Sequence, residues 1–192
     1  MANSDSELIM SKRKRELHMI VIVLRGVPGS GKTTTAKRLY EMFYNDYYGN
    51  VFIHSRDMIR QHYCNNHSID YQESFRNACV NTFVRDRYFF QLFELLHNLR
   101  KPSVIIIDAT NTKINDLYST FRVIFMSHCC LYAPLDVYVY TKRHEYQSLH
   151  GVPECIMQRF REELKESDEW LAQKKGTRCR YNFKIVNKVA LK

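Results

Sequence analysis

The residues most suggestive of chemistry are 26–33, GVPGSGKT, which have the spacing GxxxxGKT. A β-branched apolar run precedes them and a helical pattern follows, so the motif stands between a strand and a helix, as a phosphate-binding loop does. Glycines let the backbone amides turn inward toward an anion, and the following helix adds the positive end of its dipole. A turn that binds nothing would explain the Pro and Gly residues, but not a Lys-Thr pair at this offset.

This loop predicts a site for ATP and Mg²⁺. We expect Lys32 to reach the β- and γ-phosphates as a catalytic residue, and Thr33 to offer its hydroxyl to the metal ion. The residues expected to bind the nucleotide are Gly26, Gly29, Ser30, Gly31, Lys32, Thr33 and Thr34.

A carboxylate follows the second apolar run, residues 51–54. Asp57, beyond this predicted strand, is placed to accept the proton of an attacking hydroxyl as a general base. Arg60 lies three residues later on the same helical face and can bind a phosphate of the acceptor. The alternative is that Asp57 only caps its helix and Arg60 is a surface residue.

A second carboxylate ends the apolar run at residues 104–107. Asp108 therefore suits Mg²⁺, together with Thr33, and Asn111 can orient a phosphate or the acceptor. The alternative is an aspartate that caps its loop.

A third group of candidates lies at residues 143–165. Pro153 suits the first position of a helix, and the spacing of Ile156, Phe160 and Leu164 gives that helix a narrow apolar stripe. A helical lid here would bring Arg143, or in second place Arg159, to the γ-phosphate. An ordinary surface helix is the alternative.

Strand and helix patterns alternate along the chain. Strands are predicted at 17–24, 51–54, 104–107, 136–140 and 181–186, and helices at 32–44, from 57, 70–98, 115–128 and from 153. This alternation predicts an α/β fold, a parallel sheet with helices on both faces and the candidate residues gathered at the carboxyl ends of its strands.

The segment 70–98 is predicted to be one long helix with Asp70 as its N-cap. Five of its residues lie near helical spacing, and most aromatic rings are expected in the core rather than on a base-stacking surface. They are Phe75, Cys79, Phe83, Phe90 and Phe93.

Composition sets the class of protein. The chain has 192 residues, 45% of them hydrophobic, and a net charge of +9, which is typical of a folded globular chain. Basic residues cluster at 12–15 and again over 174–192, which favours polyanionic partners, nucleic acid first, although solvated tails are the alternative. Residues 1–15 are predicted to be a basic disordered arm, and 16–192 one domain.

Cysteines and hydropathy indicate the compartment. Six cysteines occur without a CxxC pair, so reduced thiols in a cytoplasmic or nuclear protein are expected. The spacing of the Cys and His residues fits no common zinc finger. No apolar run is long enough to cross a bilayer, so no membrane partner is expected.

With these motifs the chain resembles the P-loop kinases of the polynucleotide 5′-hydroxyl kinase type. The resemblance covers nearly all of 17–166 and is carried by GVPGSGKTT, RDxxR at 56–60, DATN at 108–111 and HGVP at 150–153. The chain also resembles the kinase-like domain of 2′,3′-cyclic nucleotide phosphodiesterase and small stand-alone AAA-type kinase domains.

The resemblance implies a three-layer P-loop NTPase fold with a helical lid, and ATP-dependent transfer to a 5′-hydroxyl end of RNA or DNA. It implies that Asp57 activates the hydroxyl, Arg60 contacts the acceptor strand and Arg143 contacts phosphate. Gln147 stands where related kinases often carry a second lid arginine, and no DxDGT phosphatase motif follows. Two alternatives stay open: a kinase of a small molecule such as a nucleoside or sugar nucleotide, and a nucleotide-binding module without catalysis.

Overall fold

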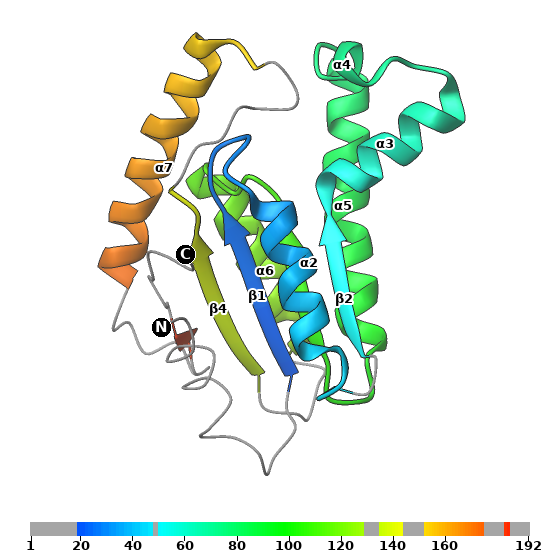
Figure 1. The fold of residues 1–192 in the computed structure, drawn as a ribbon, viewed down its shortest axis with the longest axis vertical. Coiled ribbons are helices and arrows are strands. Elements are labelled where there is room, and N and C mark those ends of the chain that lie inside the picture. Colours follow the sequence, from blue (N-terminus) through cyan, green and yellow to red (C-terminus); the bar gives the residue numbers. More distant parts are fainter. Residues whose placement is uncertain (1–18, 48–49, 129–134, 144–151, 175–182, 185–192) are drawn as a thin grey trace.

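A computed structural model describes residues 19–47, 50–128, 135–143, 152–174 and 183–184 (Figure 1). Its sheet is parallel throughout, with strand order β2-β3-β1-β4-β5. The strands are β1 Met19–Arg25, β2 Val51–Ser55, β3 Val104–Asp108, β4 Leu135–Thr141 and β5 Phe183–Lys184. The predicted basic arm and most of the basic cluster near the C-terminus lie outside the described residues.

Helices cover both faces of the sheet, so the predicted α/β fold is confirmed. The helices are α2 Lys32–Tyr44, α3 Arg56–His67, α4 Tyr71–Ser74, α5 Ala78–Asn98, α6 Ile114–His128 and α7 Glu154–Lys174. In Figure 1, α2 lies on one face, α5 and α6 lie on the other, and α7 stands beside β4. Among the described helices, none combines the length and the apolar character needed to pass through a bilayer.

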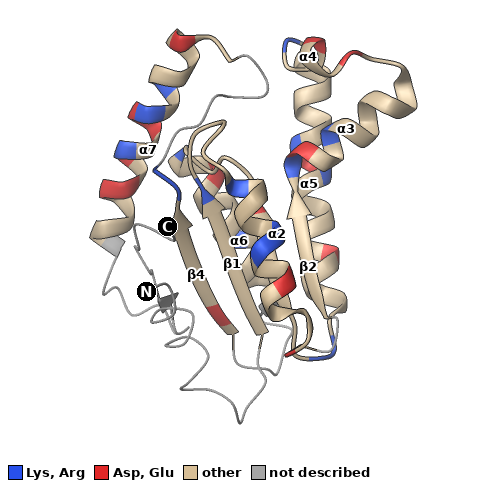
Figure 2. Cartoon of the chain, viewed as in Figure 1, with Lys and Arg blue, Asp and Glu red and all other residues tan. Residues whose placement is uncertain are grey.

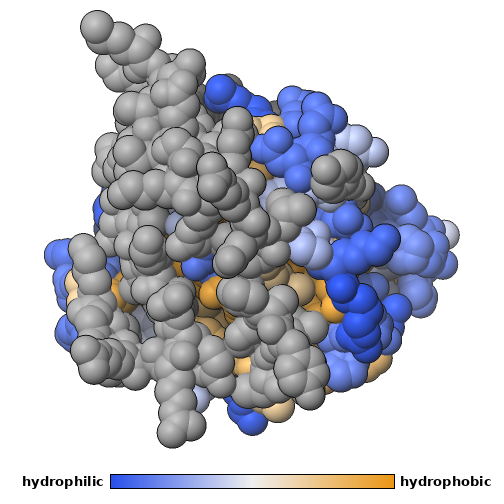
Figure 3. Space-filling view, turned by 90° about the horizontal axis from the view of Figure 1, so that it is seen from below, coloured by the Kyte–Doolittle hydropathy of each residue, from blue (hydrophilic) through white to orange (hydrophobic). Residues whose placement is uncertain are grey.

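Strand β1 shows why the strands of this sheet are unbroken apolar runs in the sequence. Met19, Val21 and Val23 pack with α5 and α6, whereas the alternate residues of β1 pack with α2. A parallel strand buried on both faces needs no polar alternation. In the view from the end where the strands begin, hydrophobic residues are visible in places, and hydrophilic residues lie toward the rim (Figure 3).

The prediction of one long helix over residues 70–98 is wrong, because this segment forms two helices, α4 and α5, each with its own N-cap. Asp70 is an N-cap, as expected, and its carboxylate accepts from the Glu73 amide at 2.9 Å. It caps only the single turn α4. The Asn77 side chain then accepts from the amides of Cys79 (3.0 Å) and Val80 (3.2 Å) and begins α5. Asparagine captures amides that a continuous helix would pair with its own backbone.

The five residues near helical spacing in this segment do not form its buried face. Four of them are phenylalanines, and their side chains are 36–51% exposed. The buried stripe of α5 is instead Val80, Val84, Tyr88, Leu92 and Leu96. Both sets fit helical spacing, but the second set, through Tyr88, Leu92 and Leu96, is the one that packs with β1, β3 and α6.

Arg25 connects the end of β1 to α7. Its guanidinium is fully buried and donates to Asp168 Oδ1 (2.5 Å), the Leu164 carbonyl (3.2 Å) and the Ser167 hydroxyl. Burial lowers the pKa of Arg25, while the ion pair with Asp168 opposes the shift. These bonds position α7 beside the loop that follows β1.

Replacing Arg25 with methionine is expected to lower the free energy of unfolding by about 3 kcal/mol, because the variant leaves buried acceptors without a donor. Arg143 is the matched control. It pairs with the same carboxylate at 2.7 Å but is 54% exposed, so Arg143→Met should change stability by less than about 1 kcal/mol. Urea denaturation of both variants measures the difference, and equal losses would contradict a special role for the buried guanidinium.

Candidate nucleotide and acceptor site

The loop after β1 has a backbone that only glycine suits. Gly26, Gly29 and Gly31 have φ values of +150°, +77° and +81°. A Cβ on Gly26 would lie 2.6 Å from the Lys142 carbonyl oxygen, so any other residue there would clash with the backbone. Gly31 is the N-cap of α2 and contributes no side-chain cap, which leaves the first amides of that helix for an anion.

Lys32 points into this loop. Its Nζ donates to the carbonyls of Val27 (2.8 Å) and Gly26 (3.0 Å). Burial lowers the pKa of Lys32 to about 8, although the nearby charges of Asp108 and Asp57 oppose the shift. The ammonium group therefore lies inside the loop, where an anion bound to the backbone amides would meet it.

Thr33 and Asp108 come together from different elements. The Thr33 Oγ1 donates to Asp108 Oδ2 at 2.8 Å, which joins the start of α2 to the end of β3. Burial raises the pKa of Asp108, while the Thr33 hydrogen bond and the Lys32 charge lower it. The pair fits Mg²⁺, which takes one or two protein oxygens and keeps phosphate and water for its other positions. Within the described residues, no group of three or more His, Cys, Asp or Glu side chains is placed to hold a metal.

Asp57 lies across the site from the loop. It is exposed in the first turn of α3, whose N-cap is Ser55, so the alternative of Asp57 as the cap is wrong. Its charge acts on both Lys32 and Asp108. Burial, followed by the charge of Asp57, raises the pKa of Tyr71, whose side chain therefore lies near Asp57. Sequence reasoning missed Tyr71, because its place depends on the single-turn helix α4.

Arg60 is not a surface residue. It is 5% exposed, and its guanidinium donates to Asn81 Oδ1 at 2.8 Å and to the Ser74 carbonyl at 3.3 Å. It also covers the ring of Phe75, with 4.2 Å from Cζ to the ring centroid. Burial lowers the pKa of Arg60. Arg60 therefore holds α4 and α5 against α3, and its predicted contact with an acceptor stays a prediction.

Asn111 is fully buried behind the loop. It has a φ of +48°, and its Nδ2 donates to the Leu24 carbonyl at 2.9 Å. The same segment makes a second bond to the loop, because the Gly26 amide donates to the Thr110 carbonyl at 2.9 Å. The DATN segment thus fixes the end of β1, and the predicted contact of Asn111 with a substrate stays a prediction.

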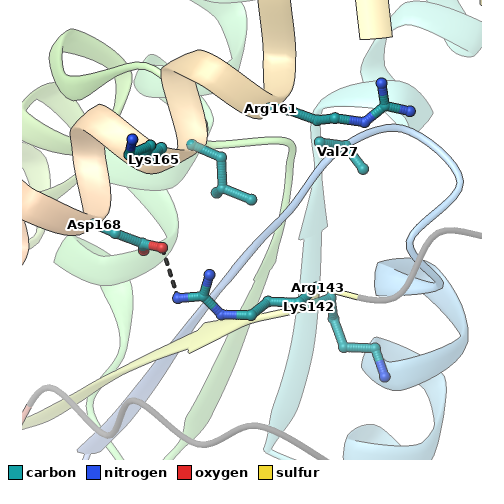
Figure 4. Close-up of a pocket in the computed structure, with 7 residues that line it drawn as sticks. Val27, Lys142, Arg143, Arg161, Lys165 and Asp168 are labelled. Carbon is teal, nitrogen blue, oxygen red and sulfur yellow. Dashed lines mark hydrogen bonds and ion pairs between the residues drawn. The ribbon is translucent and has the colours of Figure 1, made fainter. Parts of the chain in front are cut away.

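A cavity of about 210 Å³ lies between this loop and α7 (Figure 4). Its lining residues are Val27, Lys142, Arg143, Arg161, Leu164, Lys165 and Asp168. Val27 also packs with Met157 and Leu164, and with Phe160 of the predicted stripe. Basic and acidic residues alternate along α7 (Figure 2). The cavity lining contains one carboxylate, Asp168, and four cationic side chains.

The arginines of this region are placed differently from one another. Arg143 lines the cavity and pairs with Asp168, whereas Arg159 pairs with Glu163 at 3.4 Å and is not part of the lining. Sequence reasoning did not select Arg161, which lines the cavity. The spacing of Arg161 and Lys165, one helical turn apart on α7, is the signal that would have found them.

A phosphate-binding loop on a parallel sheet is accompanied by a family match over most of the chain. The sequence model of the AAA domain family (AAA_33) matches residues 21–177. The chain belongs to this AAA domain family. No curated protein sequence matches it significantly.

Solved structures show the fold that this AAA domain shares with other proteins. A chain in the Pnkp1/Rnl/Hen1 RNA repair complex is similar with 19% identity and a TM-score of 0.56, covering 83% of this chain and 48% of that chain. A gluconokinase from Sinorhizobium meliloti 1021 shows 15% identity, coverages of 92% and 86%, and a TM-score of 0.46. The Mycobacterium tuberculosis APS kinase CysC shows 12% identity and a TM-score of 0.42, covering 82% of this chain and 99% of that chain. Two of these scores fall below 0.5, so of the three the first alone informs the fold.

The AAA domain therefore has a P-loop kinase-like fold, which confirms the coarser part of the resemblance. Nucleotide binding follows from this fold together with the loop geometry.

The pKa of Lys32 predicts proton uptake when ATP binds. At pH 9 the free lysine, with a pKa of about 8, is mostly neutral, and a bound triphosphate favours the charged form. We expect about one proton to be taken up per ATP at pH 9, and the Kd to rise about tenfold per pH unit above 8. Calorimetry in two buffers of different ionisation enthalpy measures the uptake.

Lys32→Arg is the control, because arginine stays charged at this pH and should show no uptake. The same shift makes the ligand-free protein more stable as the pH rises from about 8 to 10.5, where the unfolded chain binds more protons. A binding enthalpy independent of buffer at pH 9 would contradict the lowered pKa.

Proposed function

We propose that this AAA domain is an ATP-dependent phosphotransferase and that its acceptor is the 5′-hydroxyl end of RNA or DNA. The observation that supports the transfer most is the position of Asp57. Its carboxylate is exposed at the carboxyl edge of the sheet, where an acceptor can reach it, and its charge acts on both Lys32 and Asp108.

In the proposed reaction each residue has one task. Lys32 and Arg143 neutralise charge on the transferring phosphoryl group, and Thr33 with Asp108 would hold Mg²⁺. The metal ion, when bound, neutralises charge on the β- and γ-phosphates. The acceptor oxygen forms a bond to the γ-phosphorus as the bond to the β-phosphate oxygen breaks, the acceptor proton passes to the Asp57 carboxylate, and ADP leaves.

Support for a polynucleotide acceptor comes from charge and from resemblance. The net charge of +9 favours polyanions, and the cavity beside the loop is lined by four cationic side chains. The fold is also that of a chain in an RNA repair complex. The RDxxR and DATN motifs supplied the same prediction from the sequence.

A small-molecule acceptor is the second candidate, and one observation favours it. Arg60, expected to contact an acceptor strand, donates its hydrogen bonds within the protein. A compact acceptor such as a nucleoside would need only Asp57 and the surface beside it. The third possibility, binding without catalysis, is disfavoured because the donor residues and the acceptor carboxylate lie together.

Transfer from γ-labelled ATP to a 5′-hydroxyl oligonucleotide tests the proposal, with the same oligonucleotide carrying a 5′-phosphate as the control acceptor. We expect label only on the hydroxyl end, and binding that weakens steeply with salt. A panel of nucleosides and sugar nucleotides with a coupled ADP readout follows in parallel. Transfer to a panel member and none to the oligonucleotide would replace the polynucleotide by the small molecule.

A further inference from the structure

The single turn α4 carries two aromatic rings beside the proposed acceptor carboxylate. Tyr71 begins the turn and Phe75 is its C-cap, so the two rings lie one helical turn apart. Their centroids are 5.2 Å apart at an interplanar angle of 87°, an edge-to-face contact. The Phe75 side chain is 44% exposed, although the chain has a large core in which a phenyl ring can be buried.

Two observations place these rings next to Asp57. The charge of Asp57 acts on the Tyr71 hydroxyl, so the two side chains lie close together. Arg60, one turn after Asp57 on α3, lays its guanidinium over Phe75 at 4.2 Å from the centroid. A single side chain, either Tyr71 or Arg60, therefore separates the exposed Phe75 ring from the Asp57 carboxylate.

Phe75 is also held in a fixed position. Its carbonyl accepts from Asn81 Nδ2 at 2.9 Å, and Asn81 Oδ1 in turn accepts from Arg60 at 2.8 Å. The guanidinium thus supports the ring and ties its backbone to α5. A ring held at its site loses little entropy when a flat partner stacks on it.

Phe90 shows what an ordinary exposed ring looks like in this molecule. It is 51% exposed, and Arg87 lies 5.7 Å from its centroid, a looser contact than that between Arg60 and Phe75. Phe90 lies within α5, about three turns after its start, whereas Phe75 caps the turn that begins at Tyr71, beside Asp57. The two rings match in type and exposure and differ in position.

We propose that Phe75, supported by Arg60, is a stacking platform for the nucleobase of the acceptor's terminal nucleoside. Nucleobases stack on aromatic rings and arginine planes without regard to sequence. The acceptor would then be a nucleobase-bearing alcohol, which includes a polynucleotide end or a nucleoside and excludes a simple sugar. This inference rests on the proposed phosphotransferase function and names the acceptor group that the site recognises.

An acceptor without its terminal base tests the platform. Two oligonucleotides with a 5′-hydroxyl are compared, identical except that one has an abasic terminal nucleotide. We expect wild-type protein to favour the complete acceptor by about 10-fold in kcat/KM, because a stacked base contributes that much to binding. Phe75→Ala should reduce the preference to about 2-fold and leave the rate on the abasic acceptor unchanged.

Controls separate the platform from a structural role. Phe75→Trp should keep the preference, because it keeps a ring, and Phe75→Leu should lose it while keeping apolar bulk. Phe90→Ala should leave both rates as in wild type. No preference in wild type, a preference that survives Phe75→Ala, or equal loss on both acceptors in that variant would each overturn the platform. Wild-type transfer to neither acceptor would instead refute the proposed function, and the platform would fall with it.

Discussion

Replacing Asp57 with asparagine is expected to lower the rate of phosphoryl transfer about 10³-fold while ATP binds with unchanged affinity. Asparagine has nearly the same shape as aspartate, but its amide does not accept the proton of an attacking hydroxyl. The side chain is exposed, so the substitution should leave stability within about 0.5 kcal/mol of wild type. Single-turnover transfer from labelled ATP measures the rate, and calorimetry measures the affinity.

Asp86→Asn is the matched control for this experiment. Asp86 is an exposed carboxylate on α5 that pairs with Arg85, so its loss should affect neither transfer nor ATP binding. Full transfer by Asp57→Asn would show that another group accepts the proton. Loss of ATP binding in that variant would show that Asp57 acts on the donor side.

Lys32→Met is expected to lower kcat/KM for ATP by about 10³-fold. Methionine keeps most of the apolar stem but removes the charge that meets the β- and γ-phosphates. In the ligand-free protein the ammonium group bonds two loop carbonyls, so the variant loses those bonds but also avoids burying a charge. We therefore expect a small change in melting temperature beside a large change in activity.

Titration of ATP against initial rate gives the effect on kcat/KM, and thermal denaturation with and without ATP gives the effect on binding. Lys37→Met, on the exposed side of α2, controls for loss of a positive charge from the same helix. A Lys32→Met protein that keeps a tenth of wild-type activity would contradict direct contact between this ammonium and the phosphates.

The phosphate-binding loop and the sheet could be predicted because their signals are local. The glycines that need positive φ, the lysine and the threonine all occur within one short segment. The apolar run of β3 likewise ends at its aspartate without help from other parts of the chain. The rule that strand ends share an edge then brought Asp57 and Asp108 toward the same place.

The features that the sequence did not reveal depend on partners far away along the chain. Arg25 is buried only because Ser167 and Asp168, more than 140 residues later, accept its hydrogen bonds. Arg60 is buried because α4 and α5 fold back over it. For α5, two stripes of equal spacing competed, and the close packing of its neighbours decided between them. Periodicity gives the angle between side chains around a helix but not which side faces the sheet.

The two helix starts at Asp70 and Asn77 have a consequence for how such chains diversify. Each cap sets the direction of its own helix, so the turn between them can lengthen, shorten or tilt without unwinding either neighbour. The segment that carries Tyr71 and Phe75 is therefore a natural point of insertion and deletion. Under the proposed stacking role of Phe75, substrate choice would change there while the strand, loop and helix of the phosphate-binding motif stay as they are.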